Sequence, residues 1–190
     1  MGEDKAALEI GGVTLIELAG KALADVAEGR ISIAGEPRGF VSQWPAFPDR
    51  DSPGQGPLSG FSTALSNGSS EWIAVISCDM PFVTGEVFTR LADHVSVETD
   101  AAVPIQPDDR PQPLSALYRR KPTLDAVRDL VDTTDRSLRK VLSLLATHYV
   151  PFSVFRDLPN SDHLFLNVNS PVDYRRAAAL TSLSQPSDQS

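Results

Sequence analysis

The sequence is short of cysteine, of long apolar runs and of positive charge, and each shortage excludes a class of protein. Its 190 residues include one cysteine, Cys78, so neither an internal disulfide nor a Cys-x-x-Cys metal site can form. Apolar runs reach only four or five residues, too few for a membrane-spanning helix. The first residues lack the basic and apolar regions of a secretory signal. We therefore expect a cytoplasmic protein with no membrane partner.

Positive charge is the third shortage. Lysine and arginine number 17 against 25 aspartates and glutamates, a formal net charge of −8. Such a chain repels a nucleic-acid backbone at long range, so nucleic acid is not an expected partner. A single nucleotide can still bind where local groups or Mg²⁺ neutralise its phosphates.

The remaining composition is that of an ordinary globular protein, 41% hydrophobic and 22% charged. We expect one domain over residues 1–180 and a disordered polar tail over 181–190. Helical and extended patterns alternate, which predicts an α/β three-layer sandwich with a mostly parallel sheet. Helices are expected over 14–29, 58–65, 84–95, 122–131, 138–145 and 170–180. Strands are expected over 30–34, 72–77, 101–105, 114–118, 150–155 and 165–168.

The strongest local signal comes after the apolar run Trp72 to Ser77, which reads as a strand buried on both faces. Asp79 comes just after it, and Pro81 stops the strand. Ligands of open α/β sheets bind beyond the carboxyl ends of strands, and a carboxylate there suits Mg²⁺. An isolated Asp79 fits a turn cap equally well.

Three weaker signals accompany it. Residues 54–60 place glycines before a helix, where a backbone can approach a ligand closely. Asn167 and Asn169 alternate just before a final helix, in a pattern that also fits an Asx turn and helix cap. Lys5 follows Asp4 in a glycine-bearing segment and could neutralise a triphosphate, although a terminal lysine needs no such role.

Together these segments resemble the molybdenum cofactor guanylyltransferases, and more broadly the nucleotidyltransferases with a Rossmann-like sheet. The matching motifs succeed one another along nearly the whole chain, at residues 2–6 with Gly11-Gly12, 56–60, 78–82, 112–118, 136–139 and 167–171. The family opens with a strand and a glycine-rich loop of the pattern LAGGxSxRMGxDK, and this sequence contains only the last part of that pattern, from Met1-Gly2 onward. The expected sheet is therefore a Rossmann-like nucleotidyltransferase sheet whose first strand is missing, and we hypothesise an upstream start or a truncation.

The resemblance implies a Mg²⁺-dependent transfer of GMP from GTP to molybdopterin, with release of pyrophosphate. It implies that Asp79 and Asn169 hold the metal and that Lys5 and Asp79 are catalytic. The implied nucleotide-binding residues are Lys5, Asp51, Gly56, Pro57, Leu58, Gly60 and Asp79. The implied pterin-side residues are Gln112, Pro113, Arg136, Arg139 and Asn167.

Two alternatives stay open. Ala34 stands near the place where some family members carry an asparagine associated with the base, so a cytidylyltransferase of the same fold is the first alternative. The second is a non-catalytic module that binds a partner such as a molybdoenzyme chaperone, since the glycine-rich loop is absent.

Overall fold

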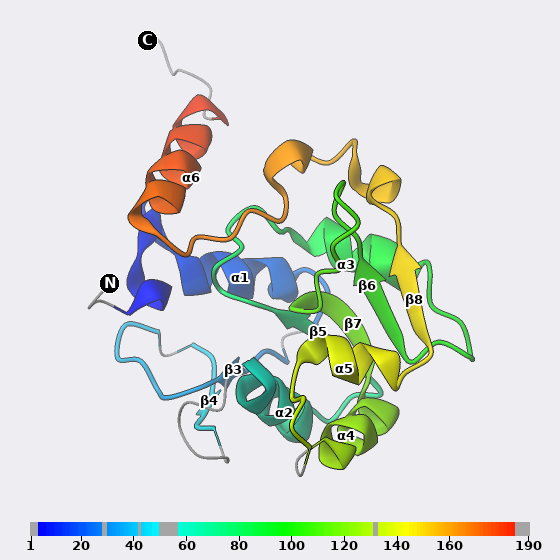
Figure 1. Ribbon diagram of the computed structural model, residues 1–190. Helices are drawn as coiled ribbons and strands as arrows, with labels where there is room; N and C mark the ends of the chain where they lie inside the picture. Colours follow the sequence, from blue (N-terminus) through cyan, green and yellow to red (C-terminus); the bar gives the residue numbers. More distant parts are fainter. Residues whose placement is uncertain (1–3, 28–29, 42, 50–56, 131–132, 185–190) are drawn as a thin grey trace.

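The structure is a computed structural model that describes residues 4–27, 30–41, 43–49, 57–130 and 133–184. Its main sheet has four strands in the order β5-β7-β6-β8 (Figure 1). Their bounds are Trp72–Ile76 for β5, Ala101–Pro104 for β6, Ser115–Arg119 for β7 and Thr147–Val150 for β8. β7 pairs antiparallel with both β5 and β6, and β6 pairs parallel with β8. Three of the four strands therefore run in one direction, as the sequence predicts.

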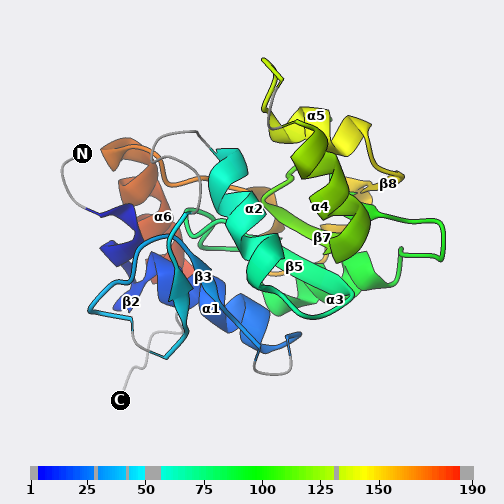
Figure 2. The same ribbon diagram turned by 90° about the horizontal axis from the view of Figure 1, so that it is seen from below.

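Helices cover both faces of this sheet and complete the predicted three-layer sandwich (Figures 1 and 2). α1 and α3 pack together on one face, and α2, α4 and α5 pack on the other. α6 lies to one side, against the N-terminal segment. The helices span Leu15–Ala24 (α1), Pro57–Asn67 (α2), Gly85–Ala92 (α3), Arg120–Asp129 (α4), Leu138–Ser143 (α5) and Pro171–Ser184 (α6).

Alternation along the strands divides the core between the two faces. Tyr118 and its β7 neighbour Ala116 point toward the helices α2, α4 and α5. Leu117, between them, points toward α3 and packs near Phe88 and Phe155. This period of two is what a sheet buried on both faces requires.

Two small sheets flank the main one. β1 (Glu9–Ile10) and β2 (Val13–Thr14) form a hairpin whose turn places Gly11 and Gly12 at φ 61° and 78°. Positive φ at both central residues favours glycine strongly, so this turn explains the Gly-Gly pair. β3 (Ile33–Ala34) pairs parallel with β4 (Ala46–Phe47). The strand predicted over 30–34 forms only at Ile33 and Ala34, which pair with the two residues of β4.

The clearest helix prediction is confirmed at its start. Thr14 caps α1, its hydroxyl accepts the Glu17 backbone N–H at 3.3 Å, and the Glu17 carboxylate accepts the Thr14 N–H at 3.1 Å. α2 and α3 also form where predicted, and α6 continues past the expected end at Leu180 to Ser184. No helix in the described part of the chain is long and apolar enough to cross a membrane.

Three strand predictions need correction. Residues 165–168 are not a strand, because their backbone follows the turn after β5 instead of pairing along another strand. The strand expected over 150–155 lies earlier in the chain, at Thr147–Val150, and a 3₁₀ helix, Phe152–Phe155, takes the place of the rest. Pro151 has no N–H and ends the pairing. β5 is only half-buried apart from Val75, because it lies at the edge of the main sheet.

An ion pair fixes α3 to the segment after β8 and gives a test of acid stability. Arg90 Nη2 donates to Asp157 Oδ2 at 2.8 Å, and this bond lowers the pKa of Asp157 to about 2. A carboxylate with a lowered folded-state pKa stabilises the fold above its unfolded pKa, and that contribution is lost as the pH falls toward 2. We expect Arg90→Gln and Asp157→Asn each to flatten the fall in unfolding free energy between pH 4 and pH 2, measured by urea titration. Arg175→Gln, an exposed control, should keep the wild-type slope.

Candidate active site

The turn after β5 forms the centre of the candidate site. Ser77 N–H still donates to the Leu114 carbonyl at 2.7 Å, and the chain then turns away through Cys78 and Asp79. The Asp79 carbonyl accepts the Val168 N–H at 2.8 Å. Asp79 Oδ1 is buried and has no hydrogen-bond partner among the described residues. A buried carboxylate oxygen without a partner is costly, which makes it a candidate for a bound cation.

The Val168 bond brings the C-terminal asparagines to the same edge of the sheet. Asn169 Oδ1 accepts a hydrogen bond from Lys5 Nζ at 3.0 Å, across 164 positions of sequence. The Asp173 carboxylate accepts the Asn169 N–H at 3.2 Å and the Ser170 N–H at 2.8 Å, which fixes this segment at the start of α6. The Ser170 hydroxyl bond is the main cause of the lowered pKa of Asp173. The structure therefore places Asn169 against Lys5 and its neighbour Val168 against the backbone of Asp79.

An ion pair lies beside this group. Arg38 Nε donates to Asp4 Oδ2 at 2.6 Å, and Asp4 also caps the short helix η1 (Lys5–Ala7) by accepting the Ala6 N–H. Burial alone would raise the pKa of Asp4, but the Arg38 and Ala6 bonds outweigh it and leave that pKa below its ordinary value. Asp4 stays ionised, so it holds Arg38 at the edge of the site.

The side chain of Cys78 has a packing role in this structure. Burial raises the pKa of its thiol, and the negative charge of Asp79 raises it further, more than the nearby Arg38 lowers it. The thiol stays protonated at neutral pH, which excludes thiolate nucleophilic catalysis. The packing interpretation made from the sequence is consistent with this environment.

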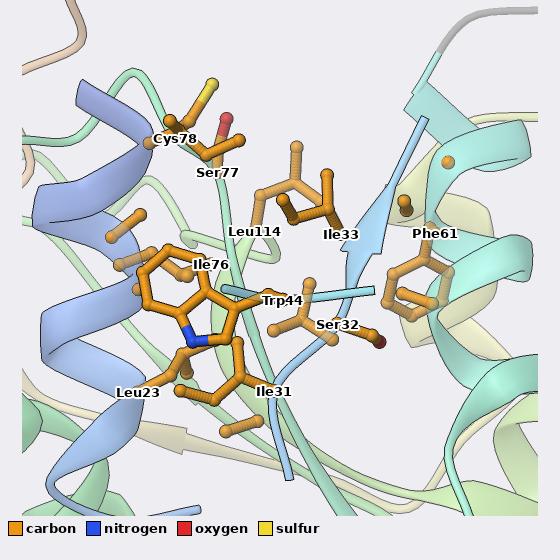
Figure 3. A pocket seen from close by; sticks show the side chains of 18 of the residues that line it. Leu23, Ile31, Ser32, Ile33, Trp44, Phe61, Ile76, Ser77, Cys78 and Leu114 are labelled. Atoms are coloured by element: carbon orange, nitrogen blue, oxygen red, sulfur yellow. The ribbon is translucent and has the colours of Figure 1, made fainter. Parts of the chain in front are cut away.

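The glycine-bearing helix α2 lies across a pocket from α1. Pro57 and Gly60 line this pocket together with Arg38 and Cys78, whereas Leu58 is buried in the core. Figure 3 shows the indole of Trp44 inside the pocket, between Leu23 and Ile76. Asp51 and Gly56 lie outside the described residues, so their predicted roles remain predictions.

The pterin-side residues separate into two groups. Gln112 is buried and Pro113 adjoins Leu114, whose carbonyl holds Ser77, so this loop reaches the same edge as Asp79. Arg136 and Arg139 are exposed at the start of α5, and Arg136 Nε donates locally to the Thr133 carbonyl at 3.4 Å. Asn167 Nδ2 donates to the Phe165 carbonyl at 3.3 Å, so its amide is turned toward its own segment.

The sequence analysis did not predict that Arg38 lies at this site. It stands in a segment rich in glycine and proline, with no periodic pattern around it. Its place beside Asp4 depends on how β3 packs, and no local sequence signal carries that information.

Comparison with known proteins decides the family. Residues 1–150 match the family described as MobA-like NTP transferase domain, which is most of the chain. The chain belongs to this family. As a MobA-like domain it is a member of a nucleotidyltransferase family, in agreement with the resemblance stated from its motifs.

Individual relatives of this MobA-like domain agree with the family assignment. A protein of Geobacillus sp. (strain WCH70) named "Probable molybdenum cofactor guanylyltransferase" is 29% identical over 179 residues, covering 91% of this chain and 89% of the relative. The solved structure of molybdopterin-guanine dinucleotide biosynthesis protein A from Archaeoglobus fulgidus superposes with a TM-score of 0.77 at 24% identity, over 96% of this chain and 92% of that one. A cytidylyltransferase of Thermus thermophilus, which acts on 2-C-methyl-D-erythritol 4-phosphate by its name, superposes with a TM-score of 0.62 at 19% identity, over 94% and 93% of the chains. These two structures support the fold.

Proposed function

We propose that this MobA-like domain transfers GMP from GTP to molybdopterin and releases pyrophosphate. The observation that carries the proposal is the convergence of Asp79, Asn169 and Lys5 at the carboxyl edge of the sheet. A carboxylate with one buried, unpartnered oxygen, an amide oxygen and an ammonium group together suit a metal–triphosphate complex. The name of the Geobacillus relative supports the choice of substrates.

The residues present fit a magnesium ion. Asp79 supplies an unpartnered buried oxygen, and Asn169 supplies a second oxygen from the segment hydrogen-bonded to Asp79. The described residues contain no cluster of three or more His, Cys, Asp or Glu that could hold a metal. Mg²⁺ commonly binds through one or two protein oxygens and completes its shell with substrate phosphates and water. When bound, it would supply charge neutralisation at the triphosphate.

Lys5 and Arg38 would provide the remaining positive charge. Lys5 Nζ is already held by Asn169 Oδ1, so its ammonium group is placed before substrate binds. Arg38 is held by Asp4 on the neighbouring side. Charges fixed in advance stabilise a developing negative charge without reorganisation at the moment of reaction.

The reaction needs alignment more than covalent chemistry. A terminal phosphate oxygen of molybdopterin would attack the α-phosphorus of GTP in line, as the bond from that phosphorus to the bridging oxygen of the β-phosphate breaks. Pyrophosphate leaves with the bonding electron pair, and Lys5 is placed to neutralise its charge. The loop that carries Gln112 and Pro113 adjoins Ser77 and would face the acceptor.

Calorimetry with Mg²⁺ tests the nucleotide assignment. We expect GTP to bind at least about tenfold more tightly than CTP, because a site that hydrogen-bonds one base leaves polar groups unpaired with another. Lys5→Ala should weaken GTP binding by about 10- to 100-fold, since it removes a charge-assisted phosphate contact. Lys21→Ala, an exposed lysine on α1, is the matched control and should leave GTP affinity unchanged.

Other outcomes point to the two alternatives. Tighter binding of CTP than of GTP would favour the cytidylyltransferase, whose fold the Thermus structure shares. Binding of neither nucleotide would contradict the proposal and favour a partner-binding module.

A further inference from the structure

The hairpin of β1 and β2 turns one backbone carbonyl outward. The Leu15 N–H donates to the Leu8 carbonyl at 2.8 Å, so Leu8 and Leu15 take a hydrogen-bonded position of the hairpin. Antiparallel strands alternate between bonded and non-bonded positions, and Glu9 faces Thr14 at the next, non-bonded one. The Glu9 carbonyl therefore points away from β2 and needs a partner from another segment.

Tyr174 of α6 supplies this partner. Its hydroxyl donates to the Glu9 carbonyl at 2.8 Å, across 165 positions of sequence. Its ring packs against the buried apolar cluster that contains Ile10 of β1. α6 also lies close to the turn of the hairpin, where a Cβ added to Gly11 would be 3.1 Å from Thr181 Cγ2. These contacts hold α6 against the N-terminal segment (Figures 1 and 2).

The residue before Tyr174 holds the other partner of the Lys5 contact. The Asp173 carboxylate accepts the Asn169 N–H at 3.2 Å and the Ser170 N–H at 2.8 Å. The Ser170 hydroxyl accepts the Asp173 N–H at 3.2 Å in return, a reciprocal cap at the start of α6. Asn169 is thus fixed to the first turn of this helix, and its side chain accepts Lys5 Nζ at 3.0 Å.

These bonds form a closed series of contacts around Lys5. Within η1 the Lys5 carbonyl accepts the Leu8 N–H at 3.1 Å, which ties the backbone of Lys5 to the residue before Glu9. The Lys5 backbone is therefore held, through Glu9, by Tyr174. Its side chain is held, through Asn169, by the cap at the start of the same helix. Two consecutive residues of α6 thus set both ends of Lys5.

The bond between Lys5 and Asn169 depends on this support. The two side chains meet at the surface, where ordering a lysine side chain costs about as much free energy as one hydrogen bond returns. The bond is favourable only where the two backbones already lie at the right separation. The Tyr174 hydroxyl is the described group that joins the N-terminal segment to α6 by a hydrogen bond on the side of Glu9.

We infer that Tyr174 is a positioning residue for Lys5, and that it acts through its hydroxyl bond to the Glu9 carbonyl. A lysine that is placed in advance pays no ordering cost when a triphosphate binds, so Tyr174 should strengthen GTP binding through Lys5. This inference deepens the proposed function and rests on it, because Lys5 neutralises the triphosphate there.

The Tyr174→Phe variant removes the hydroxyl and keeps the ring in its apolar cluster. We expect calorimetry with Mg²⁺ to show GTP binding about three- to tenfold weaker, the effect of one lost hydrogen bond. KM for GTP should rise by a similar factor while KM for molybdopterin stays unchanged. Tyr149→Phe removes the hydroxyl of an exposed tyrosine on β8 and is the matched control, which should bind GTP as the wild type does.

A double-mutant cycle separates positioning from general stabilisation. If Tyr174 acts through Lys5, its hydroxyl has no effect left to exert once Lys5 is alanine. Tyr174→Phe in the Lys5→Ala background should therefore bind GTP within about a factor of two of Lys5→Ala alone. A tyrosine that only stabilised α6 would weaken GTP binding by the same factor in both backgrounds. Circular dichroism and melting temperature establish that the variants are folded.

Chemical acetylation reports the position of Lys5 without any substrate. The Lys5 amine should react about two- to fivefold faster with acetic anhydride in Tyr174→Phe than in the wild type, because it is released from the Asn169 oxygen. Asn169→Ala, which removes that oxygen, gives the rate of a released Lys5. Lys21, exposed on α1, is the internal reference in the same mass spectrum.

The outcomes distinguish this inference from the proposed function. Unchanged GTP affinity in Lys5→Ala would contradict the role of Lys5 in the proposed function, and this inference would fall with it. If Lys5→Ala weakens GTP binding but Tyr174→Phe changes neither GTP affinity nor Lys5 acetylation, this inference alone is overturned. Equal weakening by Tyr174→Phe in both backgrounds would also overturn it, in favour of a purely structural role.

Discussion

Asp79→Asn is expected to lower GMP transfer about a thousandfold, the loss typical when a preorganised charge at a phosphoryl-transfer site is removed. The fold should survive the change. The bond from Asp79 to Val168 uses the backbone carbonyl, which asparagine keeps, and Oδ1 has no partner among the described residues to lose. Asparagine is nearly the same size as aspartate, so the metal-free variant should keep the melting temperature of the wild type.

Two measurements separate the metal role from a structural one. Melting temperature should rise with Mg²⁺ and GTP in the wild type and stay flat in Asp79→Asn, since only a site that binds in the native state stabilises it. Asp93→Asn removes an exposed carboxylate after α3 and should keep both the rise and the turnover. Full turnover in the Asp79→Asn variant would contradict the metal assignment.

Elements with strong local signals were predictable from the sequence. The Thr14–Glu17 capping box set the start of α1, because both of its hydrogen bonds lie within four residues. Ser170 and Pro171 set the start of α6 for the same reason. The apolar run of β5 gave its bounds to within a residue.

Strands that depend on distant partners were less predictable. β3 pairs with β4 over two residues, and nothing within residues 30–34 reports how far that pairing extends. The exposure of β5 depends on whether a strand lies beside it, which its own apolar pattern cannot report. The hairpin β1–β2 was missed although its Gly11-Gly12 pair is a turn signal, because each strand has only two residues.

The residues of the candidate site also depend on contacts between distant segments. Lys5 and Asn169 are each weak signals locally, and their 3.0 Å contact joins segments that lie 164 positions apart in the sequence. The order of the motifs along the sequence suggested that Lys5, Asp79 and Asn169 belong to one site. Composition and spacing alone could not show this. Arg38 belongs to no quoted motif, and its ion pair with Asp4 joins segments 34 positions apart.

Tyr118→Ala is expected to lower the free energy of unfolding by about 3–5 kcal/mol, the range for removing a large aromatic side chain from a core. Tyr118 is fully buried on β7 and meets Phe61 of α2 edge to face, with ring centroids 4.8 Å apart. Its loss would open a cavity between the sheet and the helices of one face. Urea unfolding should show the fall in midpoint without a large change in slope.

The Tyr118→Phe variant distinguishes the packing of the Tyr118 ring from the role of its hydroxyl in positioning the loop at Pro113. The Tyr118 hydroxyl donates to the Pro113 carbonyl at 2.7 Å, and burial raises the pKa of the phenol, so this donor stays protonated at any pH of assay. Phenylalanine keeps the ring but leaves that carbonyl unpaired, at a cost of about 1 kcal/mol. Because the bond fixes the loop that would face the acceptor, KM for molybdopterin should rise while KM for GTP stays unchanged. An equal rise in both constants would mean that Tyr118 supports the whole sheet and does not position the acceptor loop.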